Sequence, residues 1–422
     1  MTAPSTDTDF EVLKVPDFRR LWLANGCRDT AGEIASFALP VTAVTVLGAS
    51  PLQMGFIAMC GKVGYLLIGL PAGVWVDRWR KQAVMLAAEA AYTVALASIP
   101  LAYLIGMLTV VQLMGVAVTL SIAGVFFGIA HTSVLPLILP KKRVADAKAR
   151  LTTSESSISV ISPAAAGAVS QSMAAPILYG AAACCQLLSA LLLRRMKPTE
   201  PPPRPKADRH FGKEVTEGVR IVVQQPLLRL LLGQTALNNL GAGIMMAVTA
   251  YFLLKTLAIQ PWLFGALSTV GAVAGLIASL VCPMLRRRVG EIRMTMVFSG
   301  LAPVAMLFLP LAGLLRGEAV ALIAIAEITL GVALVGRSVA VAGLRARVTP
   351  NRYLSRVTAA VAVVTQGATP LGTMVGGVVA GIWSAQIALW VGVAVMTTPI
   401  ALLLASPLRA HRTLPTEWEV DD

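Results

Sequence analysis

Long apolar stretches recur along the whole chain, from Leu21 to Ala405, and each has about the 20 residues that an α-helix needs to cross a bilayer. The chain is 56% hydrophobic and only 13% charged. A water-soluble fold of 422 residues could not bury so much apolar surface. The sequence therefore predicts an all-α polytopic membrane protein.

The apolar stretches predict twelve membrane-spanning helices. In the first half of the chain they are expected at residues 21–47, 51–75, 83–105, 109–139, 152–174 and 175–193. In the second half they are expected at residues 227–254, 261–285, 294–315, 319–344, 357–382 and 385–404. Hydropathy locates the apolar span, so the helices can extend beyond these bounds.

Lysine and arginine gather in alternate connections between these helices. The main basic clusters lie at residues 141–150, 194–220, 286–293 and 345–356. The connections between them hold only Lys255 and Arg316. Because basic residues that flank short loops stay on the cytoplasmic side, the pattern predicts a multi-pass protein of the cell membrane with both termini in the cytoplasm.

The formal net charge of +14 would suggest nucleic acid as a partner if the protein were soluble. Here the cations fall at helix ends, at the level of anionic lipid headgroups. We therefore expect contact with membrane lipids and no nucleic-acid partner. The N-terminal segment carries acidic residues and no short apolar core, so no cleaved signal peptide is expected.

A proline-rich, charged segment divides the chain into two halves. The division predicts a six-helix bundle at residues 1–196, a cytoplasmic linker at 197–222, a second six-helix bundle at 223–405 and a cytoplasmic tail at 406–422. A shift of 210 residues brings Pro51 onto Pro261, Gly55 onto Gly265 and Gly61 onto Gly271. This constant shift predicts two pseudo-symmetric repeats, as in many transporters.

A polar motif follows the second predicted helix. It consists of Gly73, Asp77, Arg78, Arg80 and Lys81. A carboxylate and several cations at a helix end can bridge neighbouring helix termini and hold a cytoplasmic gate shut.

This motif resembles the loop motif of the major facilitator superfamily, in which a glycine, three residues, aspartate-arginine and a basic cluster follow one another. Arg80 stands where that motif has a further glycine, so we expect a different turn. The resemblance extends from Phe18 to Arg409 and implies a fold of six plus six helices that works by alternating access. The stretches LPAGVWVDRWRK and PNRYLSRVTAAVAVVTQGATPLGTMVGG also resemble the bacterial exporter branch that includes the enterobactin exporter and macrolide efflux proteins.

The fifth predicted helix contains Ser162, Pro163 and Gly167. This stretch resembles the glycine-proline antiporter motif of exporters, with serine in place of a glycine. Proline opens a backbone hydrogen bond and permits a kink, which either shapes the contact between the halves or bends the helix without further consequence.

Ionisable residues are costly in a membrane and usually face a cavity or a partner. On the first helix Asn25, Asp29 and Glu33 recur every four residues on one face, with Arg28 beside them. Asp29 either couples protons or pairs with Arg28. Glu33 is expected near mid-membrane, and Gly32-Glu33 resembles a glycine-acid pair of the exporter branch, which implies a role in proton coupling or substrate binding.

Lys62 of the second helix is expected at a similar depth, so we hypothesise an ion pair between Glu33 and Lys62. The other candidates for proton coupling are Glu327 and His131, and those for the substrate cavity are Asn238, Asn239 and Arg337. A structural role is an equal alternative for these residues. Glu89 is expected close to the cytoplasmic surface in a structural role.

Nucleotide-binding loops, metal-ligand spacings and hydrolytic triads are not found, so neither an enzyme nor a cofactor is expected. The resemblance implies a monomeric secondary transporter that exports small hydrophobic or amphipathic compounds, such as a drug or siderophore, by proton antiport. The alternatives are an uptake symporter or lysolipid flippase of the same fold, and a transport-inactive sensor or scaffold.

Overall fold

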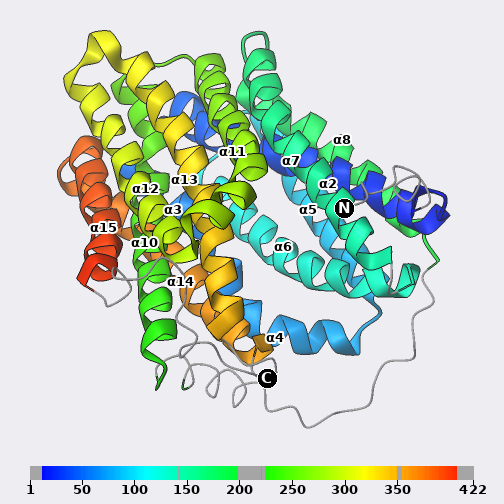
Figure 1. Cartoon of the computed structure of the whole chain (residues 1–422). Coiled ribbons are helices and arrows are strands. Elements are labelled where there is room, and N and C mark those ends of the chain that lie inside the picture. The colour runs from blue at the N-terminus through cyan, green and yellow to red at the C-terminus, as the bar shows by residue number, and fades with distance from the viewer. Residues whose placement is uncertain (1–11, 141–142, 198–219, 221–223, 349–353, 406–422) are drawn as a thin grey trace.

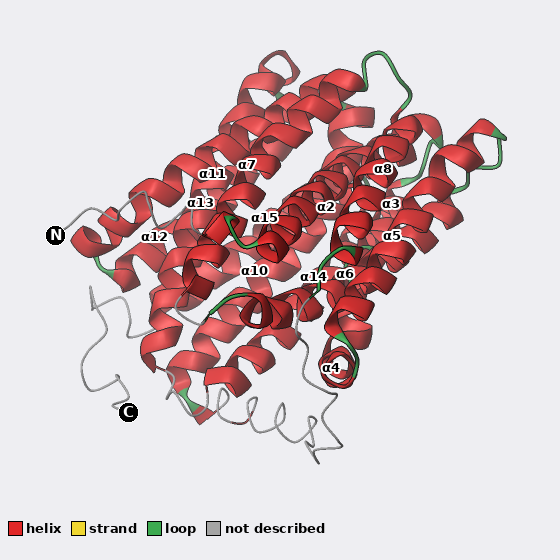
Figure 2. Cartoon of the chain, turned by 90° about the vertical axis from the view of Figure 1, so that its right-hand side faces the viewer, coloured by secondary structure: helices red, strands yellow, loops and turns green. Residues whose placement is uncertain are grey.

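The computed structural model describes residues 12–140, 143–197, 220, 224–348 and 354–405, and regular structure in these ranges is helical throughout (Figures 1 and 2). Among the described helices, nine spans are long and apolar enough to cross a membrane. The predicted all-α membrane class is therefore confirmed, and the predicted number of twelve helices is consistent with the structure.

The helices follow the order of the predicted spans. The first half contains α2 (Pro16–Val41), α3 (Pro51–Cys60), α4 (Val63–Arg78), α5 (Lys81–Leu104), α6 (Val110–Ile138), α7 (Val144–Val169) and α8 (Ala175–Arg194). The second half contains α10 (Pro226–Tyr251), α11 (Pro261–Val289), α12 (Glu291–Leu314), α13 (Ala319–Val348), α14 (Leu354–Ile382) and α15 (Ala385–Ala405). Three shorter helical pieces are η1 (Thr42–Val46), η3 (Phe252–Thr256) and η4 (Arg316–Glu318).

The second predicted span, expected as one helix, is broken into α3 and α4. The backbone N–H of Gly61 still donates to Ile57 O at 3.0 Å, but that of Lys62 donates to Met59 O at 3.0 Å, which tightens the last turn. Because α4 begins at Val63, the backbone N–H of Gly64 has no acceptor within the helix. This N–H donates instead to Ser121 Oγ of α6 at 2.9 Å. A hydroxyl of a neighbouring helix thus satisfies a backbone group that lipid could not.

The backbone repeats with the 210-residue shift seen in the sequence. The π-helical pieces η1 and η3 are related by this shift, and each follows the long first helix of its half. After them, Gly48 adopts φ 61° and its counterpart Ala258 adopts φ 53°, the one non-glycine residue with positive φ in the described chain. Because alanine rarely adopts this conformation, the repeated geometry overrides local preference. The repeat supports a duplicated chain. Of the proposed linker, residues 198–219 and 221–223 lie outside the described residues, as does the tail from residue 406.

The two halves meet through glycines that the same shift relates. Gly55 of α3 faces Gly377 of α14, and a Cβ on Gly55 would lie 2.5 Å from the Gly377 Cα. Gly265 of α11 faces Gly167 of α7, and a Cβ on Gly265 would lie 3.1 Å from the Gly167 Cα. Figure 2 shows α7 running beside α11. Helices that pack this closely need glycine at the contact.

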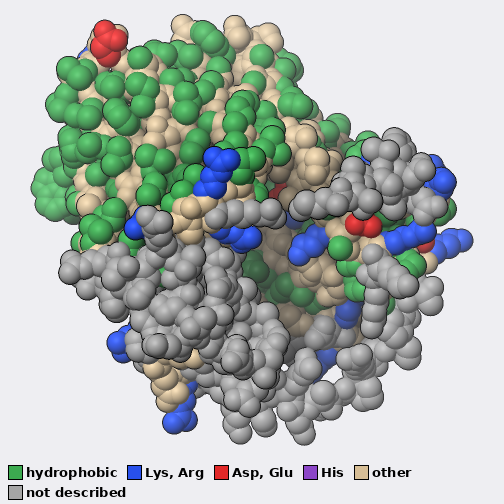
Figure 3. Space-filling model, viewed as in Figure 1, with side chains coloured by type: hydrophobic (Ala, Val, Ile, Leu, Met, Phe, Trp, Pro, Cys, Tyr) green, Lys and Arg blue, Asp and Glu red, His purple; other side chains and the backbone are tan. Residues whose placement is uncertain are grey.

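Large apolar side chains cover the outside of the bundle (Figure 3). Leu280 is 76% exposed, Val111 75% and Leu104 73%. In water such a surface would be an aggregation hazard, so its presence agrees with a lipid surrounding.

Within the second half, α10 and α14 pack on a further glycine contact. A Cβ on Gly372 would overlap the backbone carbonyl of Leu240 and lie 3.1 Å from the Gly243 Cα. We expect Gly372→Ala to lower the free energy of unfolding by about 2 kcal/mol, because overpacking of a tight contact forces the backbone apart. Thermal unfolding of the purified protein measures this. Gly115→Ala is the matched control, since no atom lies within 4 Å of a Cβ built there. Equal stability of the two variants would contradict the prediction.

Candidate functional site

A cavity of about 500 Å³ lies between the two halves. Its lining comes from α2, α3, α5 and α6 of the first half and from α10, α11 and α13 of the second. The residues that line it are Gly32, Ala35, Ser36, Leu39, Pro40, Met54, Ile57, Ala58, Gly61, Lys62, Tyr92, Ala117, Leu120, Ser121, Met246, Thr249, Ala250, Phe264, Ser268 and Glu327. We call it the central cavity. Its wall is mainly apolar, with a few hydroxyls and two charged side chains.

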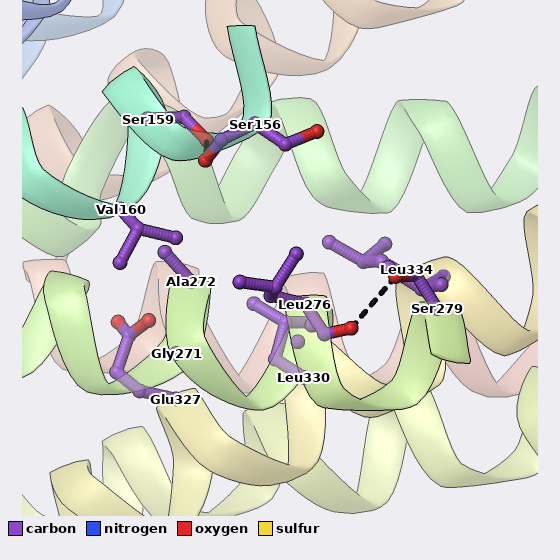
Figure 4. Close-up of a pocket in the computed structure, with 13 residues that line it drawn as sticks. Ser156, Ser159, Val160, Gly271, Ala272, Leu276, Ser279, Glu327, Leu330 and Leu334 are labelled. Carbon is purple, nitrogen blue, oxygen red and sulfur yellow. Dashed lines mark hydrogen bonds between the residues drawn. The ribbon is translucent and has the colours of Figure 1, made fainter. Parts of the chain in front are cut away.

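A second space of about 360 Å³ lies between α7, α11 and α13 (Figure 4). Its polar side chains are Ser156 and Ser159 of α7, Ser279 of α11 and Glu327 of α13. We call it the serine groove. It runs from Glu327 toward the ends of α11 and α13 that carry the basic loops, whereas the central cavity extends the other way along these helices.

Glu327, a predicted candidate for proton coupling, lines both spaces. A Cβ on Gly271 would lie 2.8 Å from Glu327 Oε2, so glycine at this position makes room for the carboxylate. Among the described residues, no hydrogen bond and no ion pair is made by the Glu327 carboxylate. An unpaired carboxylate between two cavities is able to bind a proton or a cationic group.

On α2, Asn25 Nδ2 donates to Asp29 Oδ2 at 3.0 Å, so the predicted common face is present. The expected pairing of Asp29 with Arg28 is wrong, because Arg28 turns into the first half and binds Glu89 instead. Glu155, which the sequence pattern does not single out, belongs to α7, a helix that packs against α2.

The Arg28–Glu89 ion pair is the buried electrostatic contact of the first half. Arg28 Nη1 lies 2.9 Å from Glu89 Oε1, with the Glu89 side chain fully buried and that of Arg28 14% exposed. Gln186 of α8 donates to the other Glu89 oxygen. The guanidinium also lies 3.8 Å from the Phe127 ring centroid and 5.1 Å from that of Tyr92. The structural role expected for Glu89 fits this contact, and its expected depth near the cytoplasmic face stays a prediction.

Lys62 lies in the break between α3 and α4 and lines the central cavity. It makes no ion pair with Glu33, so the hypothesised Glu33–Lys62 bridge is not formed in this structure. The reason is the break itself: Lys62 ends a helical turn instead of continuing along the face of a straight helix. Its side chain is exposed to the cavity.

The remaining candidates lie at separate places. His131 stacks on Phe127 with centroids 5.6 Å apart, and its Nε2 is buried without a hydrogen-bond partner in the described chain. Asn239 Nδ2 donates to Thr365 O of α14 at 3.0 Å and so joins two helices. Asn238 is buried on α10, and Arg337 is half-buried on α13. These four residues are absent from the linings of the two spaces.

The polar motif spans the end of α4 and the start of α5. Lys81 Nζ donates to Val76 O at 2.5 Å and to Trp79 O at 3.2 Å, which caps the end of α4. Arg80 has φ −64° and ψ 123°, an ordinary extended conformation, so no glycine is needed there. Arg78 and Arg80 are exposed, a Cβ on Gly73 would meet nothing within 4 Å, and the Asp77 side chain lies outside the described set. The gate role stays a prediction.

The motif of Ser162, Pro163 and Gly167 from the fifth predicted span lies on α7, where the two halves touch. A Cβ on Gly265 would lie 2.5 Å from Pro163 O, and one on Gly167 would lie 3.1 Å from Trp262 O. Of the two alternatives left open for this motif, the contact between halves is therefore the one the packing favours.

Comparison with known proteins gives three kinds of match. The family described as Major Facilitator Superfamily matches residues 21–372. An uncharacterized MFS-type transporter, y4rN of Sinorhizobium fredii, is 25% identical over 414 residues, which cover 93% of this chain and 96% of that protein.

Among solved structures, a mutant of the nucleoside transporter NupG has a TM-score of 0.76 at 11% identity, covering 92% of this chain and 99% of the other. A bacterial homologue of the iron transporter ferroportin in its inward-facing state has a TM-score of 0.73 at 17% identity, covering 93% and 98%. A D-xylose-proton symporter has a TM-score of 0.66 at 13% identity, covering 96% and 99%. At these identities the likeness concerns the fold alone, and it includes transporters of several kinds.

Proposed function

Because the chain belongs to the Major Facilitator Superfamily, we propose that it is a secondary active exporter of small hydrophobic or amphipathic compounds, driven by proton antiport. The protein acts as a monomer in the cell membrane, with both termini in the cytoplasm. Export and antiport rest on the resemblance to the exporter branch and on the chemistry of the cavity.

The observation that carries this proposal is the unpaired Glu327 carboxylate in a largely apolar cavity between the halves. Walls of Leu39, Met54 and Phe264 suit an apolar substrate and offer few directional hydrogen bonds. A lone carboxylate in such surroundings binds and releases protons as the cavity opens to one side or the other. One site thereby links proton occupancy to substrate occupancy.

The packing supports alternating access as part of this proposal. The glycine contacts Gly55–Gly377 and Gly167–Gly265 close the halves on the side away from the basic loops. The serine groove extends toward the basic side, so we expect the substrate to reach the cavity from there. If the basic side is cytoplasmic, the substrate enters from the cytoplasm and leaves when the glycine contacts part.

The test is substrate-dependent proton movement in proteoliposomes, followed with a trapped pH dye while cationic dyes, macrolides and siderophores are screened. We expect Glu327→Gln to reduce coupled proton flux at least about tenfold, because the amide cannot carry a proton across. Glu33→Gln tests the second predicted carboxylate in the same assay. Glu318→Gln, an exposed acid of the same half, is the matched control.

Coupled flux that persists in both Glu327→Gln and Glu33→Gln would contradict antiport through these residues. The direction of movement separates export from the alternative of an uptake symporter, and labelled lysolipid tests the flippase. Binding of a partner protein with no flux of any compound would favour the sensor or scaffold.

A further inference from the structure

The two spaces between the halves share one side chain. Glu327 lies at one end of the serine groove and also on the wall of the central cavity (Figure 4). A compound that moves from the groove into the cavity along this wall would therefore come within reach of this carboxylate. The properties of the two walls then restrict which compounds can do so.

The groove offers apolar surface and little demand for hydrogen bonds. Leu276, Leu330 and Leu334 form much of its wall. Two of its three hydroxyls are already engaged with their own helices: Ser159 Oγ donates to Ser156 O at 2.9 Å, and Ser279 Oγ donates to Leu276 O at 2.6 Å (Figure 4). A polar compound would lose hydrogen bonds to water in the groove and gain few from the protein in return. An apolar compound would have no such hydrogen bonds to lose.

The serine groove has one charged side chain among its described lining residues, that of Glu327. Among the described lining residues, the basic side chain is Lys62, and it lies within 4.0 Å of no carboxylate. Arg28 is already held by Glu89 inside the first half. An ionised Glu327 therefore has no ion-pair partner among the described residues and no basic side chain beside it in the groove, and a carboxylate in such surroundings is costly.

We propose that Glu327 binds the positively charged group of the transported compound, so that the substrate is a lipophilic cation whose apolar body lies in the serine groove. This inference rests on the proposed transport function and adds the substrate class. The groove extends from Glu327 to Val335 along α13, a rise of about 12 Å at 1.5 Å per residue, which sets the length of apolar body that fits. Proton and cation exclude each other at one carboxylate, and an anionic compound would meet no basic side chain among the described residues of the groove.

The first test is binding of two probes of nearly the same shape and opposite charge, tetraphenylphosphonium and tetraphenylborate, to the purified full chain in neutral detergent. We expect saturable binding of the cation and none of the anion. Glu327→Gln should raise the Kd for the cation at least about tenfold, because it removes the countercharge. Glu327→Asp should keep most of the affinity, and Glu318→Gln should keep all of it. Equal binding of both probes, or unchanged affinity in Glu327→Gln, would overturn the proposal.

The second test uses pH and does not depend on the folding of one variant. Besides Glu327, the titratable side chains in the linings are Lys62 from the α3–α4 break and Tyr92 from α5; Glu33 follows the lining residue Gly32 on α2, and Glu155 precedes the lining residue Ser156 on α7. In the wild type, affinity for tetraphenylphosphonium should fall as the pH is lowered from about 8 to about 5, since protons compete for a carboxylate. This dependence should persist in Glu33→Gln and vanish in Glu327→Gln.

A pH dependence that vanishes in Glu33→Gln and persists in Glu327→Gln would overturn the proposal. Binding in detergent requires no transport. If tetraphenylphosphonium binds as described but no proton-coupled flux is found, the proposed function fails while this inference stands. If flux is found with another class of compound and the cation does not bind, the proposed function stands while this inference fails.

Discussion

Glu89→Ala is expected to lower the free energy of unfolding by about 3 to 5 kcal/mol, because it leaves the Arg28 guanidinium buried without its partner. The loss should appear as poor expression and a large drop in thermal stability. Replacing both partners, as Arg28→Met with Glu89→Leu, should restore most of the stability, since an apolar pair of similar volume demands no countercharge.

The measurement is thermal unfolding of the wild type, Glu89→Ala and the double variant in one detergent. Glu318→Ala serves as control because that side chain is exposed. A double variant as unstable as Glu89→Ala alone would contradict this expectation, and would show that Gln186 and Phe127 hold the site in some way other than through the ion pair.

The second large effect concerns which side of the membrane the cavity faces. A Cβ on Gly55 would lie 2.5 Å from the Gly377 Cα, so a leucine there cannot coexist with the closed contact. We expect Gly55→Leu to shift the population toward a state open on that side by at least about tenfold, a change that needs only ~1.4 kcal/mol.

A single cysteine at Ser268, on the wall of the central cavity, reports this shift. The five native cysteines are first replaced by serine. A membrane-impermeant thiol reagent should label the wild-type background from the basic-loop side, whereas Gly55→Leu should add labelling from the opposite side. Gly115→Leu is the control, because a Cβ there meets nothing within 4 Å. Labelling from one side only in Gly55→Leu would count against the glycine contact as the closing device.

The general fold is predictable because its determinants are periodic and local. Apolar length gives the spans, and the 210-residue shift alone aligns Gly55 with Gly265, the two glycines that later prove to lie at the contacts between the halves. The same shift relates the positive φ of Gly48 and Ala258, which sequence preference would assign only to the glycine. Repeated architecture therefore carries more information than residue propensity.

The site is predictable in part. The cost of an acid in the membrane marks Glu327 as a candidate, and this residue lies between two cavities. The partner of Arg28 is not predictable in this way, because Glu89 lies 61 positions away and which helices adjoin is a tertiary property. The position of Glu89 along its helix indicates how deep it lies in the membrane, but not that its side chain points into the bundle. Likewise, nothing local indicates that the second span breaks at Gly61 and moves Lys62 off the expected helix face.

Protons and a lipophilic cation are proposed to move in opposite directions through one carboxylate, that of Glu327. The most direct test is accumulation of tetraphenylphosphonium in proteoliposomes of known orientation under pH gradients of either sign, with the membrane potential clamped. We predict accumulation against the cation's own gradient only when protons flow the other way, and loss of that accumulation in Glu327→Gln. Accumulation in the same direction as proton flow, or with no regard to its direction, would contradict this mechanism.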